Sequence, residues 1–196
     1  AQELYEGVTL KGKGSVGLIT YLRTDSTRIS EEADASCREY IAQQYGEQFV
    51  GDKTAVKSSK TGKIQDAHEA IRPTDSSLSP AMLKEQLPRD LFRLYQLIWT
   101  RFLASRMAEA VYETTSVKIG AGDYRFNVAA SKVKFDGFMT VYSYDSEKST
   151  MNAAMKKITK DTEITLSGLD PQQHFTQPPA HFTEASLVKT LEELGI

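Results

Sequence analysis

The stretch GLITYLRTDS, residues 17–26, places a tyrosine and an arginine two positions apart at the end of an apolar run. In an extended chain successive side chains alternate between two faces, so Ile19, Tyr21 and Arg23 are expected on one face. The ordinary interpretation is a half-buried strand in which Tyr21 packs and Arg23 reaches solvent. The other interpretation is a nucleophile beside its electrostatic partner.

A tyrosine that attacks a phosphodiester needs help, because a free phenol has a pKa near 10 and only about one part in a thousand is ionised at neutral pH. A guanidinium stays protonated and is no base, but it can bind the non-bridging phosphate oxygens and stabilise the charge of the transition state. Attack by tyrosine would conserve the bond energy as a phosphotyrosine ester, so strand cleavage would be reversible without an external energy source.

A second polar stretch, QDAHEAIRPTD at residues 65–75, contains His68, Glu69 and Arg72. On a short helix His68 and Arg72 would share a face at positions i and i+4 and could grip one anion. A structural cluster with satisfied hydrogen bonds is the alternative. Between the two stretches lies a lysine-rich loop, residues 51–65, which we interpret as solvated, and we assign no role to His174 and His181.

Composition predicts a soluble protein without a global attraction to polyanions. The 196 residues carry a net charge of −2, with 40% hydrophobic and 26% charged residues, so a site for nucleic acid must be local. No apolar run is long enough to span a membrane, and the N-terminal residues do not resemble a secretory signal. The single cysteine, Cys37, fits a reducing compartment, and we expect a cytoplasmic protein. The ends of the sequence suggest a piece of a longer chain.

The elements that position these residues are predicted to be helical first. Ser30 is a plausible N-cap for an amphipathic helix over 31–45 that ends at Gly46. Pro80 and Pro88 are plausible first positions of a short helix and of a longer one that is apolar nearly all round. We expect the longer helix to lie at the centre of the core.

From about residue 111 the sequence alternates and is rich in β-branched and aromatic residues, with a Gly-Ala-Gly-Asp turn. Residues 138–144 and 162–169 continue this strand-like pattern, so we predict an antiparallel sheet over 111–169. Thr183 then caps a last helix with Leu187, Leu191 and Leu194 on one face. The predicted class is α+β, with a mainly helical part, an antiparallel β segment and a terminal helix.

These two polar stretches and the residues around them resemble those of a known protein family. GLITYLRTDSTRIS is similar to the active-site segment of bacterial type IA DNA topoisomerases, whose pattern is G-L-I-[ST]-Y-x-R-T-D-S, and QDAHEAIRPTD is similar to their second signature. HEAIRPT, rather than HHAIIPT, favours the bacterial topoisomerase I branch. LYQLIWTRFLASRM, IGAGDYRF, FDGF and QHFTQPPAHFTEASLVKTLEELGI match in order, so the resemblance runs through essentially all 196 residues.

The resemblance implies catalytic roles for three residues. Tyr21 corresponds to the nucleophile that forms a covalent 5′-phosphotyrosine, Arg23 to the arginine at the scissile phosphate, and His68 to the active-site histidine. Supporting roles in orientation or DNA contact fall to Thr24, Asp25, Glu69 and Arg72.

The family architecture is a toroid of four domains, and the resemblance places this chain in part of it. Residues 1–107 would be a helical, winged-helix-like domain with the tyrosine, 108–177 an antiparallel segment of the arch, and 178–196 the start of a further, truncated helical domain. The family's Toprim domain, with its acidic Mg²⁺ site, lies N-terminal to these residues, and no D-x-D-x-[DE] cluster replaces it here. We therefore expect no metal ligand in this chain, and no cleavage or relaxation of DNA by this chain alone.

The implied activity is ATP-independent relaxation of negatively supercoiled DNA by transient single-strand cleavage, strand passage and religation. The implied partners are single-stranded or negatively supercoiled DNA and the remaining domains of the same enzyme, in the cytoplasm at the nucleoid and away from membranes. Two other classes stay open on the residues alone: a non-catalytic single-stranded DNA-binding module, and a purely structural interaction domain.

Overall fold

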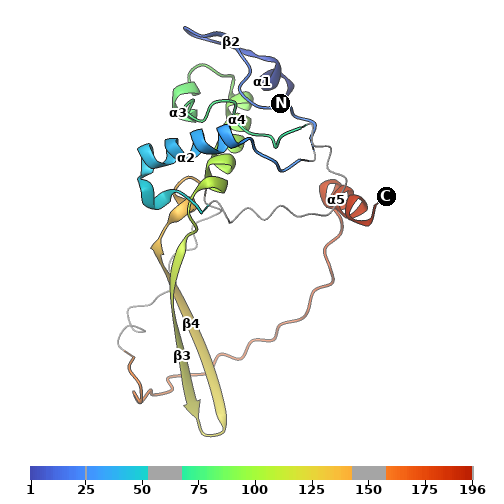
Figure 1. Cartoon of the computed structure of the whole chain (residues 1–196). Coiled ribbons are helices and arrows are strands. Elements are labelled where there is room, and N and C mark those ends of the chain that lie inside the picture. The colour runs from blue at the N-terminus through green and yellow to red at the C-terminus, as the bar shows by residue number, and fades with distance from the viewer. Residues whose placement is uncertain (25, 53–67, 143–157, 196) are drawn as a thin grey trace. The chain divides into compact units, whose positions relative to one another are not determined.

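The computed structural model describes residues 1–24, 26–52, 68–142 and 158–195, and Figure 1 shows their elements. The chain divides into two compact units, Ala1–Lys157 and Ile158–Ile196. Helices and antiparallel strands are both present, which confirms the predicted α+β class. The elements of the first unit are α1 (Gln2–Glu6), β1 (Val8–Leu10), β2 (Gly14–Val16), α2 (Glu31–Tyr45), η1 (Glu47–Phe49), α3 (Pro80–Leu83), α4 (Arg89–Arg106), β3 (Val111–Ala121), β4 (Tyr124–Phe135) and η3 (Gly137–Thr140).

The predicted helix starts are confirmed by their caps. The Ser30 side chain accepts a hydrogen bond from the backbone N–H of Ala33 at 3.3 Å, which satisfies one of the free donors at the start of α2. Pro80 is the first residue of α3, where its missing N–H costs nothing. Pro88, predicted as the first position of the longer helix, is instead the N-cap of α4, which begins one residue later at Arg89.

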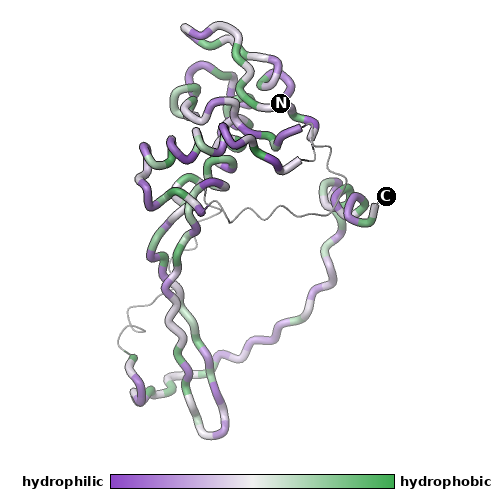
Figure 2. The backbone as a smooth tube through the Cα atoms, viewed as in Figure 1, coloured by the Kyte–Doolittle hydropathy of each residue, from purple (hydrophilic) through white to green (hydrophobic). Residues whose placement is uncertain are grey.

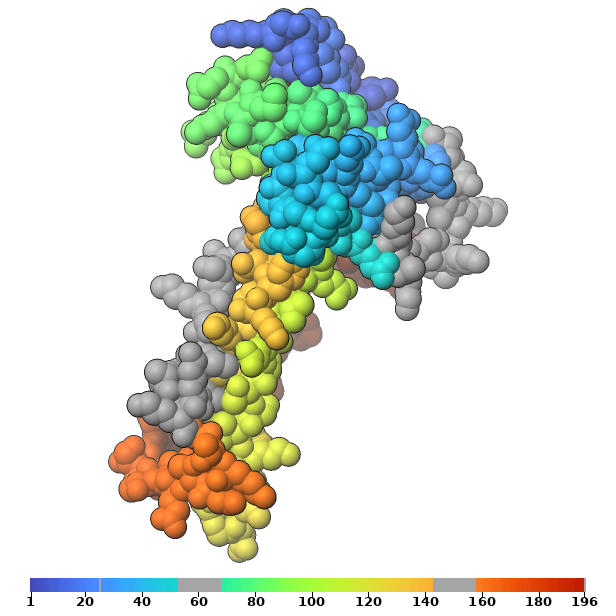
Figure 3. Space-filling view, turned by 60° about the vertical axis from the view of Figure 1, so that its left-hand side comes forward, coloured from blue at the N-terminus to red at the C-terminus, as the bar shows by residue number. Residues whose placement is uncertain are grey.

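The core of the first unit forms around α4, as predicted. Tyr95, Trp99, Phe102 and Leu103 are buried, and the ring of Trp99 meets that of Tyr40 from α2 edge-on, 5.9 Å between centroids. Figure 3 shows the residues of α2, in blue and cyan, packed directly against the green residues of the α3 and α4 region. The opposite face of α4 is polar or exposed, so this helix is amphipathic rather than apolar all round.

A buried ionic cluster ties α2 to the end of α4. Asp34 forms ion pairs with Arg38 at 2.6 Å and with Arg106 at 3.0 Å, and Arg38 also donates to the carbonyl of Gly51. Burial alone would raise the pKa of Asp34, but the hydrogen bonds from the two arginines outweigh it, and the pKa is lowered. The neighbouring Cys37 thiol is buried, which raises its pKa to about 11 and keeps it protonated.

Strands β3 and β4 form one long antiparallel hairpin after α4. Their register runs from Val111 opposite Phe135 to Ala121 opposite Tyr124, and Gly122 opens the two-residue turn with φ 61°, a conformation that favours glycine. Hydrophobic and hydrophilic residues are interspersed along both strands (Figure 2). The hairpin leads away from α4, and the contact of Phe135 with Phe49, 4.8 Å between ring centroids, anchors its base (Figure 1).

Two of the predicted strands are wrong. Of residues 138–144 the structure describes the first five, and they begin in η3 rather than in a strand. The chain turns there because Gly137 has φ 50° and Phe138 donates to the carbonyl of Ala108 at 2.9 Å, which returns Phe138 to the core. Residues 162–169 are extended but unpaired within the described ranges, and a strand needs such a partner.

The second unit consists of extended chain followed by α5 (Glu184–Leu194). The predicted Thr183 cap is confirmed, since its hydroxyl accepts from the N–H of Ser186 at 3.2 Å in a capping box. The leucines on one face of α5 are exposed within this unit. The predicted domain boundaries at residues 107 and 177 stay a prediction.

Candidate active site

Two segments far apart in the sequence, residues 17–30 and 68–75, lie side by side in the first unit. The N–H of Thr20 donates to the carbonyl of Arg72 at 2.9 Å, and the N–H of Thr74 donates to that of Leu18 at 3.0 Å. Ile19 and Pro73 form an isolated antiparallel bridge between these bonds. The two stretches that carry the predicted chemistry are therefore joined into one irregular ladder.

Helix α1 fixes the start of the tyrosine segment. The carbonyl of Leu4 accepts hydrogen bonds from the N–H groups of Leu18, at 2.7 Å, and Ile19, at 3.3 Å. At Gly17 an added Cβ would lie 2.6 Å from the carbonyl oxygen of Tyr5, so only glycine allows this approach. These contacts fix the position from which the chain leaves the core towards Tyr21.

The segment 17–26 is not the half-buried strand considered from its alternation. Leu18 and Ile19 are adjacent in sequence and both are buried, at 0% and 1% exposure, so the alternation of faces fails. The cause is that the backbone of this segment bonds to α1 and to residues 72–74 rather than to a neighbouring strand. After Ile19 the chain emerges from the core, and Tyr21 lies at the surface with 38% exposure.

Two other rings contact that of Tyr21. The ring of Tyr5 meets it edge-on, with 5.5 Å between centroids and 69° between planes. The centroid of the His68 imidazole lies 5.1 Å from that of Tyr21, and the two planes are inclined by 35°. The structure thus brings together Tyr21 and His68, which are 47 positions apart in the sequence. A partly exposed phenol beside an imidazole can meet a substrate and exchange a proton nearby.

Arg23 lies on the same exposed stretch as Tyr21. Its side chain is exposed and makes no hydrogen bond or ion pair with any residue that the structure describes. The neighbouring Thr24 accepts a hydrogen bond from the N–H of Ser26 at 3.0 Å, which curls the chain there. Asp25 lies outside the described residues, as do the lysines of the 53–67 region.

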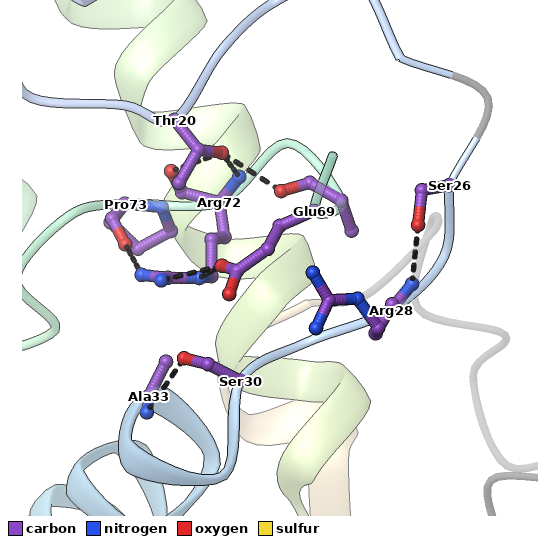
Figure 4. Close-up of polar contacts among 9 residues, drawn as sticks. Thr20, Ser26, Arg28, Ser30, Ala33, Glu69, Arg72 and Pro73 are labelled. Atoms are coloured by element: carbon purple, nitrogen blue, oxygen red, sulfur yellow. Dashed lines mark hydrogen bonds and ion pairs between the residues drawn. The ribbon is translucent and has the colours of Figure 1, made fainter. Parts of the chain in front are cut away.

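Glu69 and Arg72 bind each other. The Nε and Nη2 atoms of Arg72 donate to one carboxylate oxygen of Glu69 at 2.9 and 2.7 Å, and Nη1 donates to the carbonyl of Pro73 at 3.0 Å (Figure 4). The suggested short helix at His68 and Arg72 is wrong, because these residues adopt irregular structure bonded to the 17–30 segment. Arg72 consequently faces Glu69 in this structure, and its contact with DNA stays a prediction.

Two contributors were not predicted from the sequence. Tyr5 belongs to QELYEG, and nothing in that stretch indicates that its ring meets Tyr21. Thr20 precedes Tyr21, and alternation placed it on the opposite face. Its hydroxyl instead bonds to residues 70 and 72. The one sequence feature that could have pointed to a role for Thr20 is its position directly before Tyr21.

Neither a metal cluster nor a membrane span is found in the described ranges. Among these residues no group of three or more His, Cys, Asp or Glu side chains converges on a point. The same residues contain no helix whose length and hydrophobicity would suit a bilayer. His174 and His181 lie in the exposed part of the second unit.

Comparisons with known proteins agree on one family. A family profile described as DNA topoisomerase matches residues 1–196. The structure of full-length topoisomerase I from Thermotoga maritima is similar to this one, with 35% sequence identity and a TM-score of 0.68. The match covers 100% of this chain and 30% of the Thermotoga maritima chain, so this chain spans less than a third of that protein's length.

Proposed function

Since this chain belongs to the family of bacterial type IA DNA topoisomerases, we propose that it supplies the nucleophile for transient breakage of one DNA strand. The observation that carries the proposal is the exposed phenol of Tyr21 against the imidazole of His68, on a ladder that joins the two signature segments. Single-stranded or negatively supercoiled DNA is the substrate class that follows from this proposal.

The proposed step is a displacement at phosphorus. The phenolic oxygen of Tyr21 bonds to the phosphorus and loses its proton, while the bond from phosphorus to the 3′ oxygen breaks and that oxygen takes up a proton. The 5′ phosphate is left as a phosphotyrosine ester, and the same exchange in reverse rejoins the strand. No nucleotide cofactor is consumed, because the ester retains the energy of the original bond. Relaxation follows when another strand passes before rejoining.

Arg23 and His68 are the side chains that we propose assist this step. Arg23 is exposed two positions after the nucleophile in the sequence, and its guanidinium would bind the phosphate and stabilise the added charge. The imidazole of His68 can hold or relay a proton next to the phenol, or bind the DNA backbone. Thr24, Asp25, Glu69 and Arg72 are proposed to orient the segments or contact DNA.

The described residues do not suit the Mg²⁺ ion that the family uses. Magnesium is held by carboxylates and water, but the carboxylate of Glu69 is paired with Arg72, and no acidic cluster occurs in the described ranges. We place the Mg²⁺ ligands on other domains of the enzyme. On this proposal the 196-residue chain alone neither cleaves nor relaxes DNA.

The test is a chimera in which this chain replaces the matching part of the Thermotoga maritima enzyme. A single-stranded oligonucleotide labelled at its 3′ end is incubated with the chimera and Mg²⁺, and the reaction is stopped with detergent. We expect a labelled covalent adduct, and none with Tyr21→Phe, which removes only the hydroxyl. A folded chimera that binds the oligonucleotide but forms no adduct would contradict the proposal and favour a non-catalytic DNA-binding module.

A further inference from the structure

One hydroxyl bridges the two segments of the site. The Thr20 hydroxyl donates to the carbonyl of Ala70 at 2.8 Å, and its oxygen accepts from the N–H of Arg72 at 2.9 Å. Figure 4 shows Thr20 facing Arg72 from the neighbouring segment. The backbone N–H of Thr20 adds a third bond, to the carbonyl of Arg72 at 2.9 Å. The residue directly before Tyr21 therefore bonds to Ala70 and Arg72, two and four positions after His68.

These bonds fix the backbone at Ala70, two positions after His68. Ala70 is held on both sides, because its N–H donates to the carbonyl of Arg28 at 2.8 Å while its own carbonyl accepts from Thr20. His68 lies two residues earlier, and its ring contacts the ring of Tyr21. The position of the imidazole against the phenol thus depends on where Ala70 is fixed.

The pair of hydrogen bonds made by the Thr20 side chain requires a hydroxyl group. Thr20 is half-buried, and its oxygen both donates and accepts, which a hydroxyl can do and a methyl group cannot. Valine has the same shape but would leave the Ala70 carbonyl and the Arg72 N–H without their partner in a partly desolvated place. Serine would keep both bonds.

We propose that Thr20 is a positioning residue whose hydroxyl holds the imidazole of His68 against the ring of Tyr21. Its effect on DNA cleavage rests on the proposed function of Tyr21, but the geometric coupling does not. The two can therefore be tested separately.

The geometric test uses NMR of the 196-residue chain, whose three histidines can be told apart by substitution. The ring of Tyr21 displaces the C–H resonances of His68, and the displacement is defined as the change on Tyr21→Ala. Thr20→Val should lose most of this displacement, and Thr20→Ser should retain it. Thr74→Val is the matched control, because the Thr74 hydroxyl joins the same two segments through the Gly17 carbonyl at 2.8 Å, away from Ala70.

The functional test measures adduct formation in the chimera at saturating oligonucleotide. Thr20→Val should slow it by roughly 10- to 100-fold, because small misplacements of reacting groups are costly. Affinity for the oligonucleotide should be unchanged, and Thr20→Ser should restore the rate. A Thr20→Val chain that keeps the His68 displacement, or an equal loss in Thr74→Val, would overturn the inference. Absence of adduct in the unsubstituted chimera with the NMR result intact would overturn the proposed function alone.

Discussion

The imidazole of His68 lies 5.1 Å from the ring of Tyr21, with 35° between their planes, although 47 positions separate them in the sequence. Hydrogen bonds between residues 18–28 and 70–74 join the two segments that carry these rings, and both segments lie outside the helices and named strands. Tyr21 is exposed in this contact, and the exposed Arg23 follows it two positions later in the sequence.

Replacing His68 should lower activity without unfolding the chain. His68→Ala in the chimera is expected to slow adduct formation by about 100-fold, the low end of what a positioned acid or base contributes. The side chain is only half-buried, so the thermal midpoint should change little. Single-turnover cleavage measures the rate. The exposed His174→Ala is the control, and an equal effect of both substitutions would argue against a role for His68.

Replacing Arg23 should affect the transition state rather than the fold. We expect Arg23→Ala to slow adduct formation by about 100- to 1,000-fold, as does removal of a group that stabilises developing charge. Arg125 is an exposed arginine at the hairpin turn that bonds only to nearby carbonyls among described residues, so Arg125→Ala is the control. Unchanged cleavage by Arg23→Ala would remove this residue from the proposed step.

A methyl group at Gly17 should destabilise the first unit. The new Cβ would lie 2.6 Å from the carbonyl oxygen of Tyr5, so α1 or the tyrosine segment must shift, at a cost of about 1–3 kcal/mol. Denaturant unfolding of the 196-residue chain measures the loss. Gly168→Ala has open space around it and should be neutral. Equal stability of the two variants would show that the close approach is absent.

The Asp34 cluster predicts a dependence of stability on pH. The pKa of Asp34 is lowered in the folded chain, so its contribution is fully present above the unfolded pKa of about 4 and is lost as pH falls through the folded value. Asp34→Asn should cost about 1–3 kcal/mol at pH 7, because it leaves Arg38 and Arg106 without a charged partner. The difference between the two chains should shrink in acid.

The control for this prediction is Glu193→Gln. Its ion pair with Lys189 is 3.8 Å long and exposed, so the substitution should change the free energy of unfolding little at any pH. A pH-independent deficit in Asp34→Asn would show that packing, rather than charge, accounts for the loss.

The helices could be predicted because their capping residues lie close to them in the sequence. The geometry of the site could not, because it depends on hydrogen bonds between residues far apart in the sequence. Ser30, Pro80 and Thr183 mark helix starts within a few residues of sequence, because capping satisfies groups in the same turn. The strand-like residues 162–169 could not be judged in this way, since a strand depends on a distant partner. Alternation misplaced Thr20 for the same reason: its bonds go to residues 50 and 52 positions away.

In the proposed step Tyr21 becomes covalently attached to DNA. The most direct measurement is mass spectrometry of the adduct isolated from the chimera, after digestion of the protein and trimming of the DNA. We predict a nucleotide phosphate on the peptide that contains Tyr21, linked to its phenolic oxygen. A modification on any other residue, including the adjacent ring of Tyr5, would contradict the assignment, as would an adduct that persists in Tyr21→Phe.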